Sequence, residues 1–247
     1  RVTRKMTLYT GIEQEKAQKI LAQQVTQISA AEHGFLPPDI VRKLLEIYGI
    51  SMPPEGLAQT SQEAVALARQ IGFPVALKII SPDIPHKTDI GGVLLGIQDE
   101  ASVHAGFEQI MANAKRAQPE ASIVGISIQR MIPQGQEVIV GAVQDAQFGH
   151  LVMFGSGGIE VEGLKDVAFA LAPITEEEVG YLLDSTWGGR KLNGYRNIPP
   201  ADQASVKETI YRLAQLAADL PQIQEIEINP LRVLEGGAYA LDVRARL

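Results

Sequence analysis

Cysteine is absent from the 247 residues of this chain. Disulfide bonds, thiolate catalysis and cysteine-ligated zinc or iron–sulfur centres are therefore excluded. Long apolar runs are absent too: they are only strand-length, as at 138–140, so we expect neither a transmembrane helix nor a signal peptide. Positive charge is in deficit, because 22 Lys and Arg residues face 29 Asp and Glu residues, for a net charge of −7. This balance leads us to expect no nucleic-acid partner, and without a membrane-spanning run we expect a cytoplasmic protein with no membrane partner.

The chain does have the composition of a soluble globular protein, with 45% hydrophobic and 21% charged residues. Its length allows one large domain or two lobes. The first residue is Arg1 rather than methionine, which suggests a fragment or a processed chain.

Two helices are predicted in the N-terminal part. Residues 13–33 have mostly polar faces and one apolar stripe at helical spacing, made of Ala17, Leu21, Val25 and Ile28. This pattern is typical of a linker, or of an arm that packs on something outside the chain. A second helix opens at Pro37–Pro38 and ends at Gly49.

The rest of the sequence predicts two lobes with mixed helices and strands. The first contains a helix from the capping box of Thr60 and Glu63 to Ile71, strands at 75–80 and 93–97 around a polar loop at 81–92, and a helix at 102–115. The second contains strands at 123–131, 137–144 and 151–154, helices near 175–186 and 203–220, and strands at 225–234 and 238–245 joined at Gly236-Gly237. The helix near 175–186 has its own capping box, Thr175 with Glu178.

Lys78 is the first candidate for chemistry, because it interrupts the apolar run 75–80. A charge in a buried strand is costly unless an anion accompanies it. Lys78 either points at a phosphate as a compact positive charge, or lies on an edge strand and reaches solvent.

The segment from His86 to Val93 is the densest polar cluster. The adjacent glycines Gly91 and Gly92 would let backbone amides approach a phosphate, and Lys87 adds positive charge. His86 could act as a nucleophile toward a phosphoryl group. The alternative is a solvated loop whose glycines serve a turn.

Two weaker signals could complete a nucleotide site. Main-chain groups of 129–133 could bond an adenine edge while Met131 packs on the ring, and Glu137 could accept from ribose hydroxyls or be an ordinary residue at the start of a strand. The glycine-rich turn 154–160 could approach a ligand or simply allow tight packing.

The terminal hairpin predicts a metal site. As a strand, 225–230 places Glu227 and Asn229 on one face, and Pro230 requires an edge or a bend. A turn centred on Gly236-Gly237 makes Asp242 a diagonal neighbour of Asn229 on that face. These oxygen donors suit Mg²⁺ with nucleotide phosphates. The alternative is a solvent-facing acidic hairpin, which the apolar neighbours of Asp242 disfavour.

Together these segments resemble the ATP-grasp fold, and more closely the nucleotide-binding part of ADP-forming acyl-CoA (acetyl-CoA) synthetases, relatives of the succinyl-CoA synthetase β subunit. The resemblance runs from about Phe35 to Leu247. It is carried by 72–78, the loop from His86 to Val93, 136–141, 154–162, 227–231 and Leu241-Asp242.

The resemblance implies a role for each candidate residue. His86 looks like the family's second phosphohistidine, which would move on its loop between ADP and a distant acyl-phosphate site. Mg²⁺ ligands are implied at Asn229 and Asp242, with Glu227 as a possible helper. Nucleotide contacts are implied at Lys78, at the lid residues Gly91, Gly92 and Val93, at the adenine hinge Gln129, Met131 and Ile132, and at the ribose-binding Glu137.

The resemblance also implies an α/β (α+β) ATP-grasp architecture: a helical arm at 1–34, lobes at 35–125 and 126–247, and the nucleotide between the lobes. It implies the reaction acid + CoA + ATP = acyl-CoA + ADP + phosphate, with CoA and a small carboxylic acid bound by an α-type subunit or fused domain. This chain alone should bind ATP or ADP without completing that reaction. A further oligomer is possible.

Two alternatives stay open. The chain could be a non-catalytic, ligand-sensing region of a protein acetyltransferase, although the presence of His86 disfavours this. It could also be another ATP-grasp ligase, which would need no nucleophilic histidine on a loop.

Overall fold

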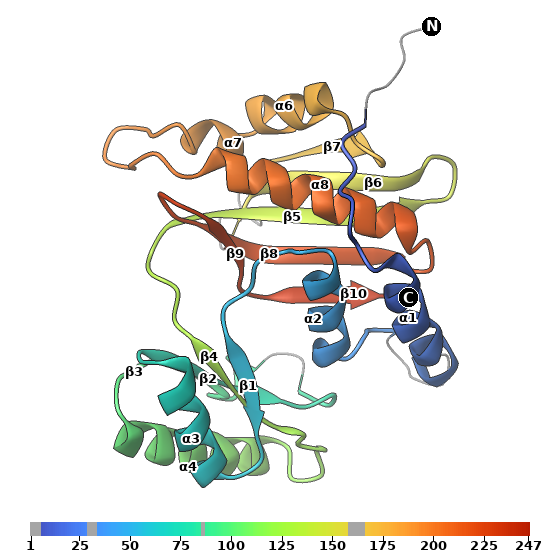
Figure 1. The fold of residues 1–247 in the computed structure, drawn as a ribbon. Helices are drawn as coiled ribbons and strands as arrows, with labels where there is room; N and C mark the ends of the chain where they lie inside the picture. The colour runs from blue at the N-terminus through green and yellow to red at the C-terminus, as the bar shows by residue number, and fades with distance from the viewer. Residues whose placement is uncertain (1–5, 29–33, 85–86, 158–165) are drawn as a thin grey trace, which may run out of the picture. The chain divides into compact units, whose positions relative to one another are not determined.

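The computed structural model describes residues 6–28, 34–84, 87–157 and 166–247 (Figure 1). The chain divides into two compact units. The small unit is Pro53–Pro133, and the large unit joins Arg1–Met52 to Gln134–Leu247. The expected division at 125/126 is therefore wrong, because it would cut the first strand residue from the rest of β4 (Gly125–Arg130). The expected lobe at 35–125 also wrongly included 35–52, whose helix joins the core of the large unit.

The small unit is a four-stranded antiparallel sheet covered by helices on one face. Its order is β1-β4-β2-β3, where β1 is Glu55–Ala58, β2 is Val75–Ile80 and β3 is Val93–Ile97. Helices α3 (Ser61–Ile71) and α4 (Glu100–Ala117) pack on it. Alternation along β2 sends Leu77 and Ile79 into the core with Val103 and Phe107, which leaves Lys78 on the opposite face.

The caps of the two predicted capping boxes differ in detail. At α6 (Glu176–Ser185) the complete box of Thr175 and Glu178 is present, as predicted. At α3 the Thr60 hydroxyl accepts from the Glu63 amide, but the Glu63 carboxylate accepts from the Gln59 amide at 2.7 Å, one residue before the predicted donor. The predicted helix start is confirmed in both cases.

The large unit is built on a six-stranded antiparallel sheet of order β10-β8-β5-β6-β7, in which β9 also pairs with β8. The strands are β5 Gln136–Asp145, β6 Gly149–Ser156, β7 Val167–Leu171, β8 Glu225–Val233, β9 Ala238–Ala240 and β10 Val243–Arg246. Helices α6, α7 (Trp187–Lys191) and α8 (Gln203–Asp219) pack on it, and α8 contacts β5, β6 and β8. Apolar side chains of α8 and of alternate positions in β5 and β8 form the core.

The N-terminal helices belong to this core. In α1 (Gln14–Ile28), Ala17 and Leu21 are buried against α2 (Pro38–Ile47), whose Leu44 and Leu45 are fully buried. The expectation that this helix packs on something outside the chain is therefore wrong. Its narrow apolar stripe was matched by another stripe in the same sequence, which spacing alone does not reveal.

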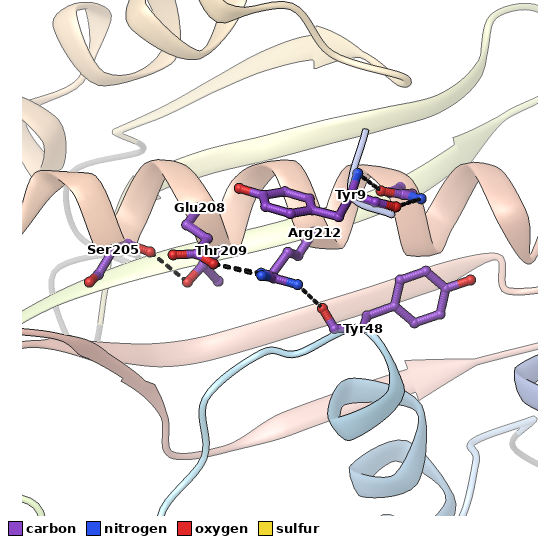
Figure 2. Close-up of polar contacts among 7 residues, drawn as sticks. Tyr9, Tyr48, Ser205, Glu208, Thr209 and Arg212 are labelled. Carbon is purple, nitrogen blue, oxygen red and sulfur yellow. Dashed lines mark hydrogen bonds and ion pairs between the residues drawn. The ribbon is translucent and has the colours of Figure 1, made fainter. Parts of the chain in front are cut away.

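Arg212 of α8 ties these N-terminal segments to the rest of the large unit (Figure 2). Its guanidinium donates to the Tyr48 carbonyl at 2.9 Å and to Glu208 at 2.9 Å, and lies 4.0 Å from the centre of the Tyr9 ring. One turn further along α8, the Gln215 side chain accepts from the Tyr9 amide at 2.8 Å. The segment before α1 and the end of α2 are thus both held on α8.

Among the helices in the described ranges, none combines the length and the apolarity that crossing a membrane would need.

Candidate functional site

Lys78 begins a row of polar side chains on the face of the small sheet opposite its helix-covered core. Its ammonium donates to the Gln129 side-chain oxygen at 2.8 Å, and the Gln129 amide donates to Glu55 at 3.1 Å. Ser127 donates to the other oxygen of Glu55. Pairing places Lys78 opposite Ser127 and Glu55 opposite Gln129, so all four share one face. The row holds the lysine charge on a surface that could receive a phosphate.

The alternative of a solvent-reaching lysine on an edge strand is wrong. Strand β2 lies between β4 and β3, and Lys78 is half-buried. Sequence reasoning missed Glu55, because β1 is four residues long and too short to show a period. The two prolines before Glu55 were its only local signal of a chain entering a sheet.

The predicted adenine hinge divides at the end of β4. Gln129 is in the strand, and its side chain belongs to the Lys78 row. Met131 and Ile132 follow the strand, in the connection that leads into the large unit at Gln134. The Met131 amide donates to the Pro74 carbonyl at 3.0 Å. The roles of Met131 and Ile132 toward a base stay predictions.

The glycines of the 87–93 segment form a turn. The Gly91 amide donates to the Thr88 carbonyl at 3.0 Å, and the Gly92 amide donates to the Lys87 carbonyl at 2.8 Å. Gly91 has a φ of +66°, which favours glycine. Both amides therefore already have acceptors, and their proposed contact with a phosphate would require this turn to open. Val93 begins β3 opposite Lys78.

The loop before this turn is anchored more firmly than its polar sequence suggests. Ile84 is 1% exposed and packs in the core of the small unit. Asp83 accepts from the Ser122 amide at 2.7 Å, and Asn113 of α4 donates to the Gly91 carbonyl at 3.1 Å. The loop predicted as polar at 81–92 is thus anchored in the core at Ile84. His86 lies outside the described residues.

In the large unit, Asn229 and Asp242 are direct neighbours. The Asn229 amide donates to the Asp242 carbonyl at 3.0 Å, and β10 continues the same register with Val243 opposite Ile228. The predicted diagonal relation is therefore wrong by two residues. A shift of two residues keeps every side chain on its face, so the predicted shared face is retained.

The shift originates in the hairpin turn. The Leu234 amide donates to the Gly237 carbonyl at 2.9 Å, which leaves Glu235 and Gly236 as the two loop residues. The turn is centred one residue earlier than predicted. The two glycines suggested the wrong centre, because Gly237, with a φ of +102°, closes the turn instead of lying within it.

Pro230 is accommodated by a bulge in an interior strand. Val138 pairs with Leu231 while Val140 pairs with Ile228, so Asn229 and Pro230 together face the single residue between them on β5. Strand β8 lies between β5 and β10, so Pro230 is not in an edge strand. Of the two predicted explanations for this proline, only a bend in the strand remains. The bulge therefore includes Asn229 itself, which pairs with Asp242 on its other side.

Glu227 completes this cluster from the same face. Burial raises the pKa of the Glu227 carboxyl, and the opposing effect of a hydrogen bond from the Asn229 side chain is smaller. Asp242 is exposed, so its apolar neighbours in sequence gave no reason to bury it. Within the described ranges no three His, Asp or Glu side chains converge on one point. The donors are thus two carboxylates and one amide, a set that fits Mg²⁺ with waters and phosphates as its other ligands.

Glu137, predicted to contact a ribose, forms an ion pair with Arg232, its opposite residue on β8. Both side chains are partly exposed. The carboxylate is therefore held in place by a cation of the same sheet. Its contact with a ribose stays a prediction.

Comparison with known proteins shows which family the chain belongs to. Residues 27–247 match the ATP-grasp domain family. The chain belongs to the ATP-grasp family. Over 223 residues it is 40% identical to subunit beta of acetate–CoA ligase [ADP-forming] I from Pyrococcus furiosus, covering 90% of this chain and 96% of that subunit. Over 243 residues it is 38% identical to acetate–CoA ligase [ADP-forming] I from Archaeoglobus fulgidus, of which it spans 34%.

A solved structure extends the likeness to three dimensions. Acetyl-coenzyme A synthetase 1 of Ca. Korarchaeum cryptofilum superposes with a TM-score of 0.81 at 30% identity, covering 94% of this chain and 99% of that chain. That structure is described as a complex with coenzyme A and Mg-AMPPCP, with its phosphohistidine segment pointing towards the nucleotide-binding site. Our ATP-grasp chain thus corresponds to the ATP-grasp part of the ADP-forming CoA ligases, which is a separate subunit in one relative and a third of a longer chain in another.

In this ATP-grasp chain the glycine-rich turn serves packing wherever it is described. A Cβ on Gly157 would lie 2.5 Å from the Val138 backbone, and one on Gly188 of α7 would lie 2.6 Å from the Ser156 amide. No side chain fits such approaches, so the tight-packing alternative holds for Gly155 and Gly157. The part of the turn from 158 to 160 lies outside the described residues.

Proposed function

We propose that this chain binds Mg-ATP and Mg-ADP for the phosphoryl-transfer half of an ADP-forming acyl-CoA ligase. The observation that carries this proposal is the pair Asn229 and Asp242 beside Glu227, a hard-oxygen donor set built by one hairpin. The relatives named above support it, because both are ADP-forming acetate–CoA ligases and the solved structure was obtained with Mg-AMPPCP.

The residues of each unit then have defined tasks. Asn229 and Asp242 would hold the metal, with Glu227 as helper, and the bound Mg²⁺ would neutralise charge on the nucleotide phosphates. Lys78 would place its ammonium on a phosphate, held by Gln129 at 2.8 Å. Phosphoryl transfer depends on positioning and charge neutralisation more than on covalent chemistry by the protein. Gly91, Gly92, Val93, Met131, Ile132 and Glu137 would complete the nucleotide contacts.

His86 would accept the phosphoryl group. A lone pair of its neutral imidazole forms the N–P bond to the γ-phosphorus, while the bond from phosphorus to the β–γ bridging oxygen breaks and its electron pair leaves with ADP. The neutral ring is accessible near physiological pH, because the reference pKa of histidine is about 6.5. Transfer to a second acceptor would be a further displacement, in which an oxygen of that acceptor forms a bond to phosphorus while the N–P bond breaks and its electron pair returns to the imidazole.

The second acceptor would belong to an α-type CoA-binding subunit or fused domain, which would also bind CoA and a small carboxylic acid. The subunit name of the Pyrococcus relative supports such a partner. Because the complete reaction would consume ATP and CoA, we place it in the cytoplasm.

Calorimetry of ADP binding with and without Mg²⁺ tests the nucleotide site. Asn229→Ala combined with Asp242→Ala should remove the Mg²⁺-dependent gain in affinity, and Lys78→Ala should weaken binding with or without metal. Leu95→Ala, an exposed change in the small unit, is the control. Wild-type protein that binds neither nucleotide form would refute the proposal.

Labelling with [γ-³²P]ATP tests the transfer step. The chain, together with its proposed α-type subunit or fused domain, should acquire acid-labile, base-stable label that is lost in His86→Ala. A wild-type protein that binds Mg-ADP but never becomes labelled would leave nucleotide binding intact and rule out the phosphohistidine.

A further inference from the structure

Arg244 lies on the same face of the large sheet as the predicted metal ligands. On β10 it is directly opposite Glu227, and it follows Asp242 by two residues, which is one period of a strand. Its neighbour on this face, Arg246, lies opposite Glu225. The hairpin thus places two arginines beside the carboxylates, one next to the metal ligands and one further along.

The two arginines differ in what they contact. Arg246 forms an ion pair with Glu225, with 3.3 Å between nitrogen and oxygen. Arg244 is exposed, and it enters none of the ion pairs found among the described residues, although Glu227 lies opposite it. The Glu227 carboxylate takes a hydrogen bond from the Asn229 side chain, and the charge of Arg244 acts on it without an ion-pair contact. The guanidinium of Arg244 therefore has donors available toward the open face.

A small hollow lies at this place. It measures about 130 Å³ and is lined by Phe35, Glu225, Glu227, Arg244, Ala245 and Arg246. Small-molecule sites usually enclose about 300–1,000 Å³, so the hollow is too small for a whole nucleotide. Its two arginines differ in position: Arg244 is two residues from Asp242 along the strand, whereas Arg246 is four residues away and paired with Glu225.

The charges around Arg244 favour a phosphate as the group that it binds. Glu227 and Asp242 would be committed to a metal, and their charge would be balanced by it. A guanidinium next to them cannot bind the metal, but its planar donors match the oxygens of a phosphate that the metal also contacts.

We propose that Arg244 contacts the β- or γ-phosphate of the metal-bound nucleotide. This inference rests on the proposed function, because it requires a nucleotide at the Asn229–Asp242 pair. It assigns to the phosphates a cation that belongs to the same hairpin as the metal ligands. Arg244 then discriminates nucleotides by the phosphates beyond the first.

Arg246 provides a matched control on the same strand and face. Arg244→Gln should weaken Mg-ATP or Mg-ADP binding at least about tenfold, the loss expected when a charge-assisted hydrogen bond is removed. Arg244→Lys should recover part of the affinity, and Arg246→Gln should stay within about twofold of wild type. Displacement assays with AMP, which lacks both phosphates, should give wild-type inhibition constants for all variants. Unfolding midpoints without nucleotide should also match between Arg244→Gln and wild type.

Each other outcome has a definite meaning. Unchanged Mg-ATP and Mg-ADP affinity in Arg244→Gln overturns this inference and leaves the proposed function standing. An equal loss for AMP, or in Arg246→Gln, also overturns it, because the effect would then not depend on the phosphates near Arg244. Failure of the wild type to bind Mg-ATP and Mg-ADP removes the proposed function itself.

Discussion

At the scale of single residues, Asp166 joins the end of a strand to the start of a helix. Its carboxylate accepts from the Trp187 and Gly188 amides and from the Ser156 hydroxyl, each at 2.8 Å. Burial by itself would raise the pKa of Asp166, but these donors together lower that pKa below its ordinary value. The charged form is therefore the one that the fold stabilises.

Replacing the Asp166 carboxylate should change how the free energy of unfolding depends on pH. The pKa of Asp166 is lower in the folded protein than in the unfolded chain, where it is about 3.9. The charged carboxylate therefore stabilises the folded protein above the unfolded pKa, and this stabilisation is lost as the pH falls through the folded pKa. Asp166→Asn should therefore lower the free energy of unfolding by about 2 kcal/mol at pH 7, and by progressively less toward pH 2. Denaturant unfolding across this pH range measures the difference. Asp184→Asn, exposed at the end of α6, is the control, and a gap that is constant with pH would contradict the assignment.

At the scale of elements, the loop after β2 is held by one apolar anchor. Ile84 is buried in the small core only two residues before His86, so the loop is fixed to its own sheet close to the proposed phosphoryl acceptor. Ile84→Ala should destabilise the protein by about 2–4 kcal/mol and Ile84→Val by about 1 kcal/mol. Chemical denaturation gives both values. Leu95→Ala, at a side chain that is 64% exposed, should cost little, and an equally small cost for Ile84→Ala would place Ile84 outside the core.

At the scale of the whole molecule, two separate cores divide the chain. The small core includes Leu77 and the large core includes Leu213, and no buried residue is shared between the two clusters. Leu77→Ala should therefore speed amide hydrogen exchange mainly within 53–133, and Leu213→Ala mainly outside that range. Exchange measured by mass spectrometry on the intact protein tests this. Uniform acceleration in both variants would show that the two units unfold as one.

The elements themselves were largely predictable, because local patterns determine them. The predicted strands 75–80 and 93–97 have the observed bounds, and Thr175 with Glu178 marks the start of α6. Strand β1 was missed because it is four residues long, and β7 was missed because Val167–Leu171 lacks alternation. Short segments receive their structure from the strands they pair with, and this information is distant in sequence.

For the candidate site, the sequence by itself determined the residue types and their faces. Asn229, Glu227 and Asp242 share a face because strand side chains alternate with a period of two, and the two-residue error in register did not alter this. Only the tertiary structure decided their partners. The hydrogen bonds of Lys78 to Gln129 and of Gln129 to Glu55 join residues that are 51 and 74 positions apart. The centre of one turn decides which arginine lies opposite Glu225, and therefore why Arg246 has an ion pair and Arg244 has none among the described residues. Spacing along the chain fixes a face, whereas the choice of partner across a sheet is fixed by the packing of strands that are remote in sequence.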